Sequence, residues 1–351
     1  MQQVTYNKAI IWWLLSGILL ILAMVIIGGI TRLTGSGLSI VEWNVISGTL
    51  PPLNHTSWLV AFEKYKQFPE YQKLNFAMTL EGFKNIFWWE YLHRLLGRVI
   101  GLVFIVPFLY FWLTKQFKGW LFRRLLFILA LGMAQGLMGW IMVKSGLVDN
   151  PHVSHYRLAA HLCLAIALIF AIFWTVADLT FPKKYEPAVA KLGSLTKLAL
   201  LAVLVQIILG AFVAGLKAGF SYNTFPLMNG ALYPQQLQDT LTWVNFMENG
   251  VLMQFLHRWF AMAVLLVVVL LWRKTQKYKF TGSIKLLVTA IFLTTLIQVA
   301  LGILTLLLAV PVSLGVLHQV VAVVLAGLVL TLLHQVTLLQ KQPMRITRDQ
   351  L

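Results

Sequence analysis

The chain is 351 residues long, with 59% hydrophobic residues, only 11% charged residues and a formal net charge of +17 at pH 7. A soluble domain carries about 25% charged residues, so this composition excludes a soluble globular protein. A net positive charge is also typical of proteins that bind nucleic acid, but the distribution of the charge along the chain favours a different cause.

Long apolar stretches follow one another along the whole chain, and each can cross the roughly 30 Å hydrocarbon core of a bilayer as a helix. We expect spans at about 9–30, 92–113, 125–143, 158–177, 198–216, 255–272, 284–310 and 314–339. The first stretch is too long for the apolar core of a signal peptide and lacks a cleavage site of small residues, so we interpret it as a span. The sequence therefore predicts an all-α integral membrane protein with eight transmembrane helices.

Basic residues gather on one side of the predicted membrane. They lie mainly in the segments 114–124, 178–197 and 273–285 and in the C-terminal tail, whereas acidic and basic residues balance in the loops of the other side. By the positive-inside rule, this asymmetry predicts a cytoplasmic N-terminus and explains the charge without a nucleic-acid partner. An Arg- and Ser-rich presequence is lacking, so we expect the bacterial cytoplasmic (inner) membrane.

Four sequence patterns occur twice, in the same order, once in each half of the chain. The pairs are GGITRLTGSGLS (28–39) with GAFVAGLKAGFS (210–221), YLHRLLG (91–97) with FLHRWFA (255–261), QGLMGWIMV (135–143) with QVALGILTLL (298–307), and RLAAHLCLA (157–165) with GVLHQVVAV (315–323). We therefore predict two duplicated four-helix bundles, formed by residues 1–180 and 181–351. Such bundles hold cofactors with side chains on facing helices.

One histidine lies near the start of each even-numbered predicted helix. The four are His93, His161, His257 and His318. An imidazole in hydrocarbon is unfavourable unless it is paired or coordinated, so these residues are candidates for function. Two facing imidazoles without a cysteine or carboxylate partner suit a haem iron held from both faces. We therefore predict one haem site in each half.

Other metal sites fit the sequence less well. Glu90 and His93 have the Glu-x-x-His spacing of di-iron ligands, but Gln254 replaces the carboxylate in the second half. Zinc would need further ligands near each pair. His155 could replace His161 as a ligand, but it has no counterpart in the repeat.

Arginines and glutamines accompany the histidines in the repeat. Arg94, Arg98 and Arg258 lie at or just beyond the histidines of the second and sixth predicted helices. Guanidinium groups bind carboxylates bidentately, so we expect these residues to bind haem propionates, with snorkelling to lipid headgroups as the alternative. For Gln135 and Gln298, which lie mid-helix, we expect hydrogen bonds between helices.

The first predicted outer loop, residues 31–91, is the main difference between the halves. Gly35, Gly37 and Gly48 allow its first part to fold back over the first haem site. Glu42 would then lie above this site, and the second half has no carboxylate at the matching position. Glu42 is therefore our candidate for proton transfer, against the alternative of a solvated loop carboxylate.

Several of these segments together resemble haem A synthase, of the cysteine-poor type found in proteobacteria and mitochondria. They are GGITRLTGSGLSIVEWNVISGTLPPL, KYKQFPEYQKLNFAMTLEGFKNIFWWEYLHRLLGR, AGLKAGFSYNTFPLMNG and NFMENGVLMQFLHRW. The resemblance implies an oxygen-dependent oxidation of a haem O methyl group to a formyl group, through hydroxylated haem, which gives haem A for terminal oxidases. It also implies substrate haem O between His93 and His161, a haem b cofactor between His257 and His318, and the functional loop carboxylate at Glu42.

Two other functions share the four histidines. A dihaem b membrane cytochrome that takes electrons from a quinol would not need the Glu42 loop, and a haem carrier would give no oxygen-dependent product. The resemblance implies delivery of haem O by haem O synthase and an electron donor in the membrane. Gly132, Gly136 and Gly139 suit helix contacts within the chain or within a homo-oligomer.

Overall fold

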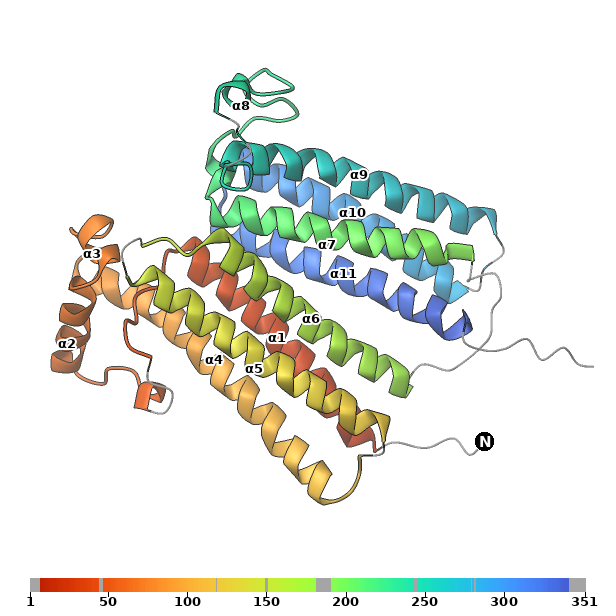
Figure 1. Cartoon of the computed structure of the whole chain (residues 1–351), viewed down its shortest axis with the longest axis horizontal. Coiled ribbons are helices and arrows are strands. Elements are labelled where there is room, and N and C mark those ends of the chain that lie inside the picture. Colours follow the sequence, from red (N-terminus) through yellow and green to blue (C-terminus); the bar gives the residue numbers. More distant parts are fainter. Residues whose placement is uncertain are drawn as a thin grey trace, which may run out of the picture.

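Long, parallel and antiparallel helices make up most of the computed structural model, which describes residues 7–43, 47–117, 119–148, 151–180, 191–240, 242, 245–278, 280 and 282–340. The long helices are α1 (Lys8–Leu33), α4 (Leu80–Leu113), α5 (Trp120–Gly146), α6 (His155–Thr180), α7 (Gly193–Gly215), α9 (Gly250–Lys277), α10 (Gly282–Leu307) and α11 (Val312–Gln340) (Figure 1). Within the described ranges, eight helices are long and apolar enough to cross a membrane. The prediction of an all-α, multi-pass membrane protein with eight spans is confirmed.

The long helices form two groups (Figure 1). We call α1, α4, α5 and α6 the N-terminal bundle, and α7, α9, α10 and α11 the C-terminal bundle. Each bundle has its own hydrophobic core, centred on Leu121 and Leu125 in the first and on Val268 and Val288 in the second. The bundles pack together through α6 against α7 and α1 against α11. Residues 181–190, at the predicted start of the second half, lie outside the described residues.

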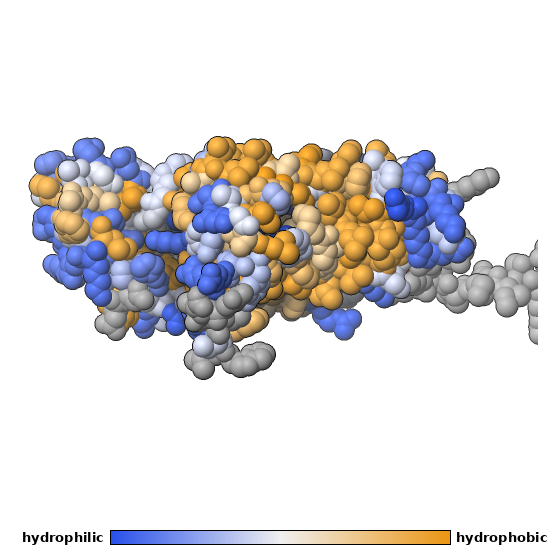
Figure 2. Space-filling model, turned by 90° about the horizontal axis from the view of Figure 1, so that it is seen from above, coloured by the Kyte–Doolittle hydropathy of each residue, from blue (hydrophilic) through white to orange (hydrophobic). Residues whose placement is uncertain are grey.

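Short helices gather at one end of the bundles, which we call the loop end. They are α2 (His55–Lys66), α3 (Pro69–Lys73) and α8 (Gln235–Thr240), with the 3₁₀ turns η1 (Ser47–Thr49) and η3 (Ala218–Phe220). Hydrophobic residues cover much of the middle of the molecule, and hydrophilic residues gather toward its two ends (Figure 2). This distribution is typical of a protein whose middle lies in lipid.

Helix α4 begins about three turns before the span predicted at 92–113. Thr79 caps it by accepting a hydrogen bond from the backbone amide of Gly82. Glu81 and Lys84 lower the hydropathy of these turns without interrupting the helix. The turns continue because Phe83 and the residues around it pack against α2. The predicted outer loop is therefore partly helical.

Candidate functional site

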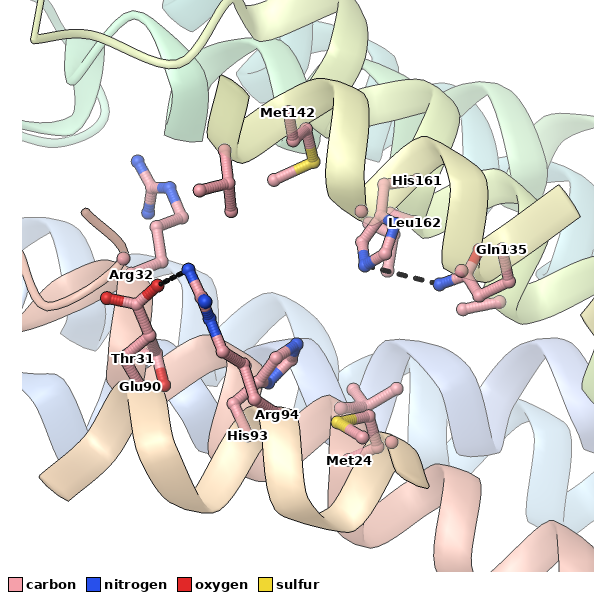
Figure 3. A pocket seen from close by; sticks show the side chains of 18 of the residues that line it. Met24, Thr31, Arg32, Glu90, His93, Arg94, Gln135, Met142, His161 and Leu162 are labelled. Atoms are coloured by element: carbon pink, nitrogen blue, oxygen red, sulfur yellow. Dashed lines mark hydrogen bonds and ion pairs between the residues drawn. The ribbon is translucent and has the colours of Figure 1, made fainter. Parts of the chain in front are cut away.

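A cavity of about 930 Å³ occupies the N-terminal bundle. It is lined by α1, α4, α5 and α6, with contributions from α3, the segment after α1, and the nearby parts of α7 and α11. His93 on α4 and His161 on α6 face each other across it (Figure 3). The structure therefore brings the first predicted histidine pair together in one cavity.

The second histidine pair lies in the C-terminal bundle. The ring centroids of His257 on α9 and His318 on α11 are 6.3 Å apart, and the ring planes are 79° apart. Imidazole nitrogens bind metals at about 2 Å, so rings on opposite sides of one metal ion have centroids about 6 Å apart. The observed spacing fits one haem iron between the two rings.

Each of the four histidine rings lies against a glycine of a neighbouring helix. The pairs are Gly28 with His93, Gly139 with His161, Gly210 with His257, and Gly302 with His318. A Cβ atom added to any of these glycines would lie 2.9–3.3 Å from the Cε1 atom of the histidine. A larger residue would displace the ring, so each glycine provides the space in which a ligand histidine sits.

Glutamines contact three of the four histidines. Gln206 donates to the carbonyl oxygen of His257 (2.9 Å), and its Nε2 lies 3.1 Å from the Nδ1 of that ring. Gln298 donates to the carbonyl oxygen of His318 (2.9 Å), and Gln135 Nε2 lies 3.3 Å from His161 Nε2. The predicted hydrogen bonds of Gln135 and Gln298 between helices are confirmed. Gln206 was missed, although a lone glutamine in an apolar helix is itself a signal.

Two arginines hold the segments that follow α1 and α7. The hydrogen bonds run from the Nη atoms of Arg94 to the carbonyls of Ile40 (2.6 Å) and Glu42 (2.7 Å), and from those of Arg258 to the carbonyls of Tyr222 (2.5 Å) and Thr224 (2.8 Å). The four carbonyls occupy matching positions in the repeat. The Nε atoms of both arginines are buried and have no hydrogen-bond partner in the described chain, so they can still donate to a ligand carboxylate.

Glu90 is a buried carboxylate that lines the large cavity beside His93. It lies one helical turn from Arg94, and its Oε1 is 2.6 Å from the Nη2 of that residue. Its Oε2 accepts hydrogen bonds from Ser39 Oγ (2.7 Å) and the backbone amide of Ile40 (2.8 Å). Only 3% of Glu90 is exposed. The sequence had marked this residue only as a di-iron candidate, through the same Glu-x-x-His spacing that places it beside His93.

Glu42 lies in a different cavity. The segment after α1 folds back over the large cavity as predicted, with Gly35 at a φ of +65°. Trp43 lines the large cavity and packs over Arg94. The side chain of Glu42, however, lines a neighbouring cavity of about 490 Å³, where its Oε1 is 2.6 Å from Lys64 Nζ. Within the described residues, Glu42 and His93 therefore line separate cavities.

Further charged groups mark the loop end of the large cavity. Arg98 lines both cavities, and Arg32 and Lys217, which the sequence analysis missed, line the large one. Glu70 on α3 is buried there and accepts a hydrogen bond from the hydroxyl of Tyr65. Burial raises the pKa of Glu70 to about 7. Basic side chains that can bind carboxylates, Arg98, Arg32 and Lys217, therefore lie at one end of this cavity.

The alternative metal sites find no support in the described ranges. No group of three or more His, Cys, Asp or Glu residues there could hold a metal ion, which disfavours a di-iron or zinc site. His155 is buried at the start of α6, against Phe212 of α7, and is not part of the large cavity. Haem ligation by histidine pairs therefore fits the donor set best.

Comparisons with known proteins show which proteins this chain is similar to. The family of cytochrome oxidase assembly proteins (COX15-CtaA) matches residues 11–330. The haem A synthase of Nitrosospira multiformis is 47% identical over 338 residues, which cover 95% of each chain. That of Flavobacterium johnsoniae is 41% identical over 336 residues, covering 94% of this chain and 98% of its own. That of Parvibaculum lavamentivorans is 44% identical over 330 residues, covering 94% of each chain.

Proposed function

Because the chain belongs to the cytochrome oxidase assembly protein (COX15-CtaA) family, we propose that it is a haem A synthase of the bacterial inner membrane. In this reaction a methyl group of haem O is oxidised to a formyl group, which gives haem A for terminal oxidases. The observation that carries the proposal is the presence of two histidine pairs in one membrane chain, one across a large cavity and one at the spacing of a haem iron.

The two bundles have different roles in this proposal. The N-terminal half (1–180) binds substrate haem O between His93 and His161, since a cavity of about 930 Å³ leaves space for a ligand that enters and leaves. The C-terminal half (181–351) holds a haem b cofactor between His257 and His318, a pair that Gln206 and Gln298 fix. A haem in this second site supplies one-electron redox chemistry. The matching glycine and arginine contacts support a duplicated unit, and the asymmetry of basic residues supports an N-terminus in the cytoplasm.

Positively charged groups orient the substrate. Arg32, Arg98 and Lys217 line the loop end of the cavity, and Arg94 and Arg258 each keep a buried Nε donor. We assign propionate binding in the substrate site to Arg94 and Arg98, and in the cofactor site to Arg258. Arg94 also holds the segment after α1 over the cavity, which keeps water from the reacting edge.

A carboxylate accepts or relays the protons that oxidation of a methyl group releases. Glu42 was the candidate from the sequence, but it lines the neighbouring cavity, whereas Glu90 lines the substrate cavity. The contacts of Glu90 with Arg94, Ser39 and Ile40 fix its position one turn from His93. Glu90 is therefore our candidate for proton transfer in the substrate cavity, and the haem A yields of Glu90→Gln and Glu42→Gln distinguish it from Glu42.

The direct test uses cells that make haem O but no haem A, with and without this protein. Mass analysis of the extracted haems is expected to show hydroxymethyl and formyl haem only when both protein and oxygen are present. The His93→Ala variant is expected to give neither product while it retains haem b in the C-terminal bundle. Unchanged haem O, together with stable low-spin haem b in the purified protein, would instead support the dihaem cytochrome that oxidises quinol. Delivery of haem O by haem O synthase would appear as faster product formation when the two proteins are co-expressed.

A further inference from the structure

We propose that the large cavity contains a second binding region, an apolar arm that holds the isoprenoid chain of the substrate. This inference rests on the proposed function and adds a site to it. The arm is the part of the cavity on the far side of the histidines from the loop end. Its lining includes Leu14, Gly17, Gly101, Phe104, Ile128 and Gly132.

The first support is the depth of the cavity. Gly28 of α1 contacts the ring of His93, and the cavity lining continues along α1 to Leu14. A helix rises about 1.5 Å per residue, so this stretch is about 21 Å long. On α4, the lining continues from His93 to Phe104, a length of about 16 Å by the same rise. A porphyrin with its iron between the histidines fills only the first part of this depth.

The second support is the separation of polar and apolar lining. Arg32, Glu70, Glu90 and Lys217 lie at the loop end, whereas apolar side chains and glycines line the arm, apart from Gln135, which contacts His161. The indole nitrogen of Trp13, at the far end, already donates to the carbonyl of Val103. Haem O also has a polar and an apolar end, because its propionates and its isoprenoid chain lie toward opposite edges of the macrocycle. Propionates at the loop end therefore direct the chain into the arm.

The third support is open space at the glycines of the arm. A Cβ atom added to Gly101 or Gly132 would meet no atom within 4 Å. Ile105 on α4 and Met133 on α5 line the cavity beside these glycines and are 43% and 64% exposed. A hydrocarbon chain can therefore lie between α4 and α5 without displacing packed side chains.

The test fills the arm without changing the histidine site. Leucine in Gly132→Leu would occupy the arm, and Gly327→Leu in α11 is the matched control, because Gly327 also has open space around it but does not line the cavity. The full-length protein, purified with its cofactor site filled, is titrated with haem O or with protohaem, which lacks the chain. Soret absorbance reports binding of the added haem to the substrate site between His93 and His161.

Gly132→Leu is expected to weaken haem O binding by about tenfold, since the leucine displaces at least two methylene groups of the chain from apolar contact. Protohaem binding by Gly132→Leu, and both affinities of Gly327→Leu, are expected to stay within about twofold of wild type. Equal losses for both haems, or unchanged haem O binding, would overturn the inference. Loss of a co-purified phospholipid without loss of haem O affinity would show that the arm holds lipid instead. If the wild-type protein binds neither haem O nor protohaem in its substrate site, the proposed function itself is overturned.

Discussion

The contact between Gly210 and His257 gives the sharpest test of how the protein holds its cofactor. In Gly210→Ala, the new Cβ would lie 3.0 Å from His257 Cε1, whereas ordinary van der Waals contact begins at 3.4 Å. The ring must therefore retreat by about 0.4 Å, the difference between these distances. Without haem the ring can turn away, but with haem its nitrogen is fixed by the iron. The strain therefore falls on the bound state.

Overpacking of this size costs about 1–3 kcal/mol. If the cost falls on haem binding, it corresponds to a loss of affinity of about 5- to 150-fold. Alanine also favours the helical state over glycine, so α7 itself should not be destabilised. The change is therefore expected in haem retention, with little change in the folded state.

Transfer of haem from the purified protein to an excess of apomyoglobin measures this retention. Gly210→Ala is expected to release haem b faster than wild type and to show shifted low-spin electron paramagnetic resonance signals. Gly327→Ala is the control, because its new Cβ would meet no atom within 4 Å. Wild-type release and unchanged spectra for Gly210→Ala would refute the role given to the glycine contacts.

Three further predictions concern the loop end. Glu90→Gln is expected to lower haem A formation by about 100-fold or more, and Glu42→Gln by only a few fold, with haem content unchanged in both. The opposite ranking of product yields would assign proton transfer to Glu42. Arg258→Lys cannot bridge the carbonyls of Tyr222 and Thr224, so faster limited proteolysis after α7 is expected, and an unchanged cleavage rate would contradict that role. Burial among Tyr65, Glu90 and Lys217 gives Glu70 a pKa of about 7 against 4.5 when exposed, so the native state binds the extra proton. The free energy of unfolding should therefore fall by about 3 kcal/mol as the pH rises from 4.5 to 7. Thermal unfolding of Glu70→Gln should show a smaller decrease over this pH range. An equal pH dependence of stability in both proteins would disprove the prediction.

The spans were predictable from the sequence because a bilayer demands uninterrupted apolar helices. The first residue of α4 was not predictable, because hydropathy marks where a helix enters or leaves the lipid and not where the helix itself begins. Glu81 and Lys84 are charged, but they continue α4 toward α2, where aromatic packing stabilises the extra turns. Tertiary contact decides such a boundary, and a local pattern does not contain it.

The histidine pairs were also predictable, because the repeat placed one imidazole on each of four helices. The position of Glu90 at the cavity was not predictable, because it depends on contacts between residues that are distant in the sequence. Ser39 and Ile40 bind Glu90 across about 50 residues of chain. The backbone that Arg94 holds at residue 42 leaves the Glu42 side chain beside Lys64, in the other cavity. Proximity along the chain to the repeated motif therefore did not reveal which of the two cavities the Glu42 side chain lines.

Matching positions in the two bundles carry different side chains, and the differences follow the proposed roles. Gln206 precedes Gly210 by four residues and donates to His257; Met24 precedes Gly28 by the same number and lines the cavity beside His93. A thioether cannot donate a hydrogen bond, so His93 lacks the support from the neighbouring helix that holds His257. A weakly held ligand suits a haem that must enter, react and leave, whereas a doubly held one suits a resident cofactor.

The same logic applies to the position one turn before these histidines. Glu90 and Gln254 each bind the segment that follows the first helix of their bundle, through Ile40 and Tyr222 respectively. Only the carboxylate can take up and release a proton, and it lies in the bundle with the large cavity. The amide of Gln254 keeps the structural contact in the other bundle without adding a titratable group next to the proposed cofactor site. In the proposed function the two bundles thus divide the work, with proton chemistry in the N-terminal bundle and electron transfer in the C-terminal one.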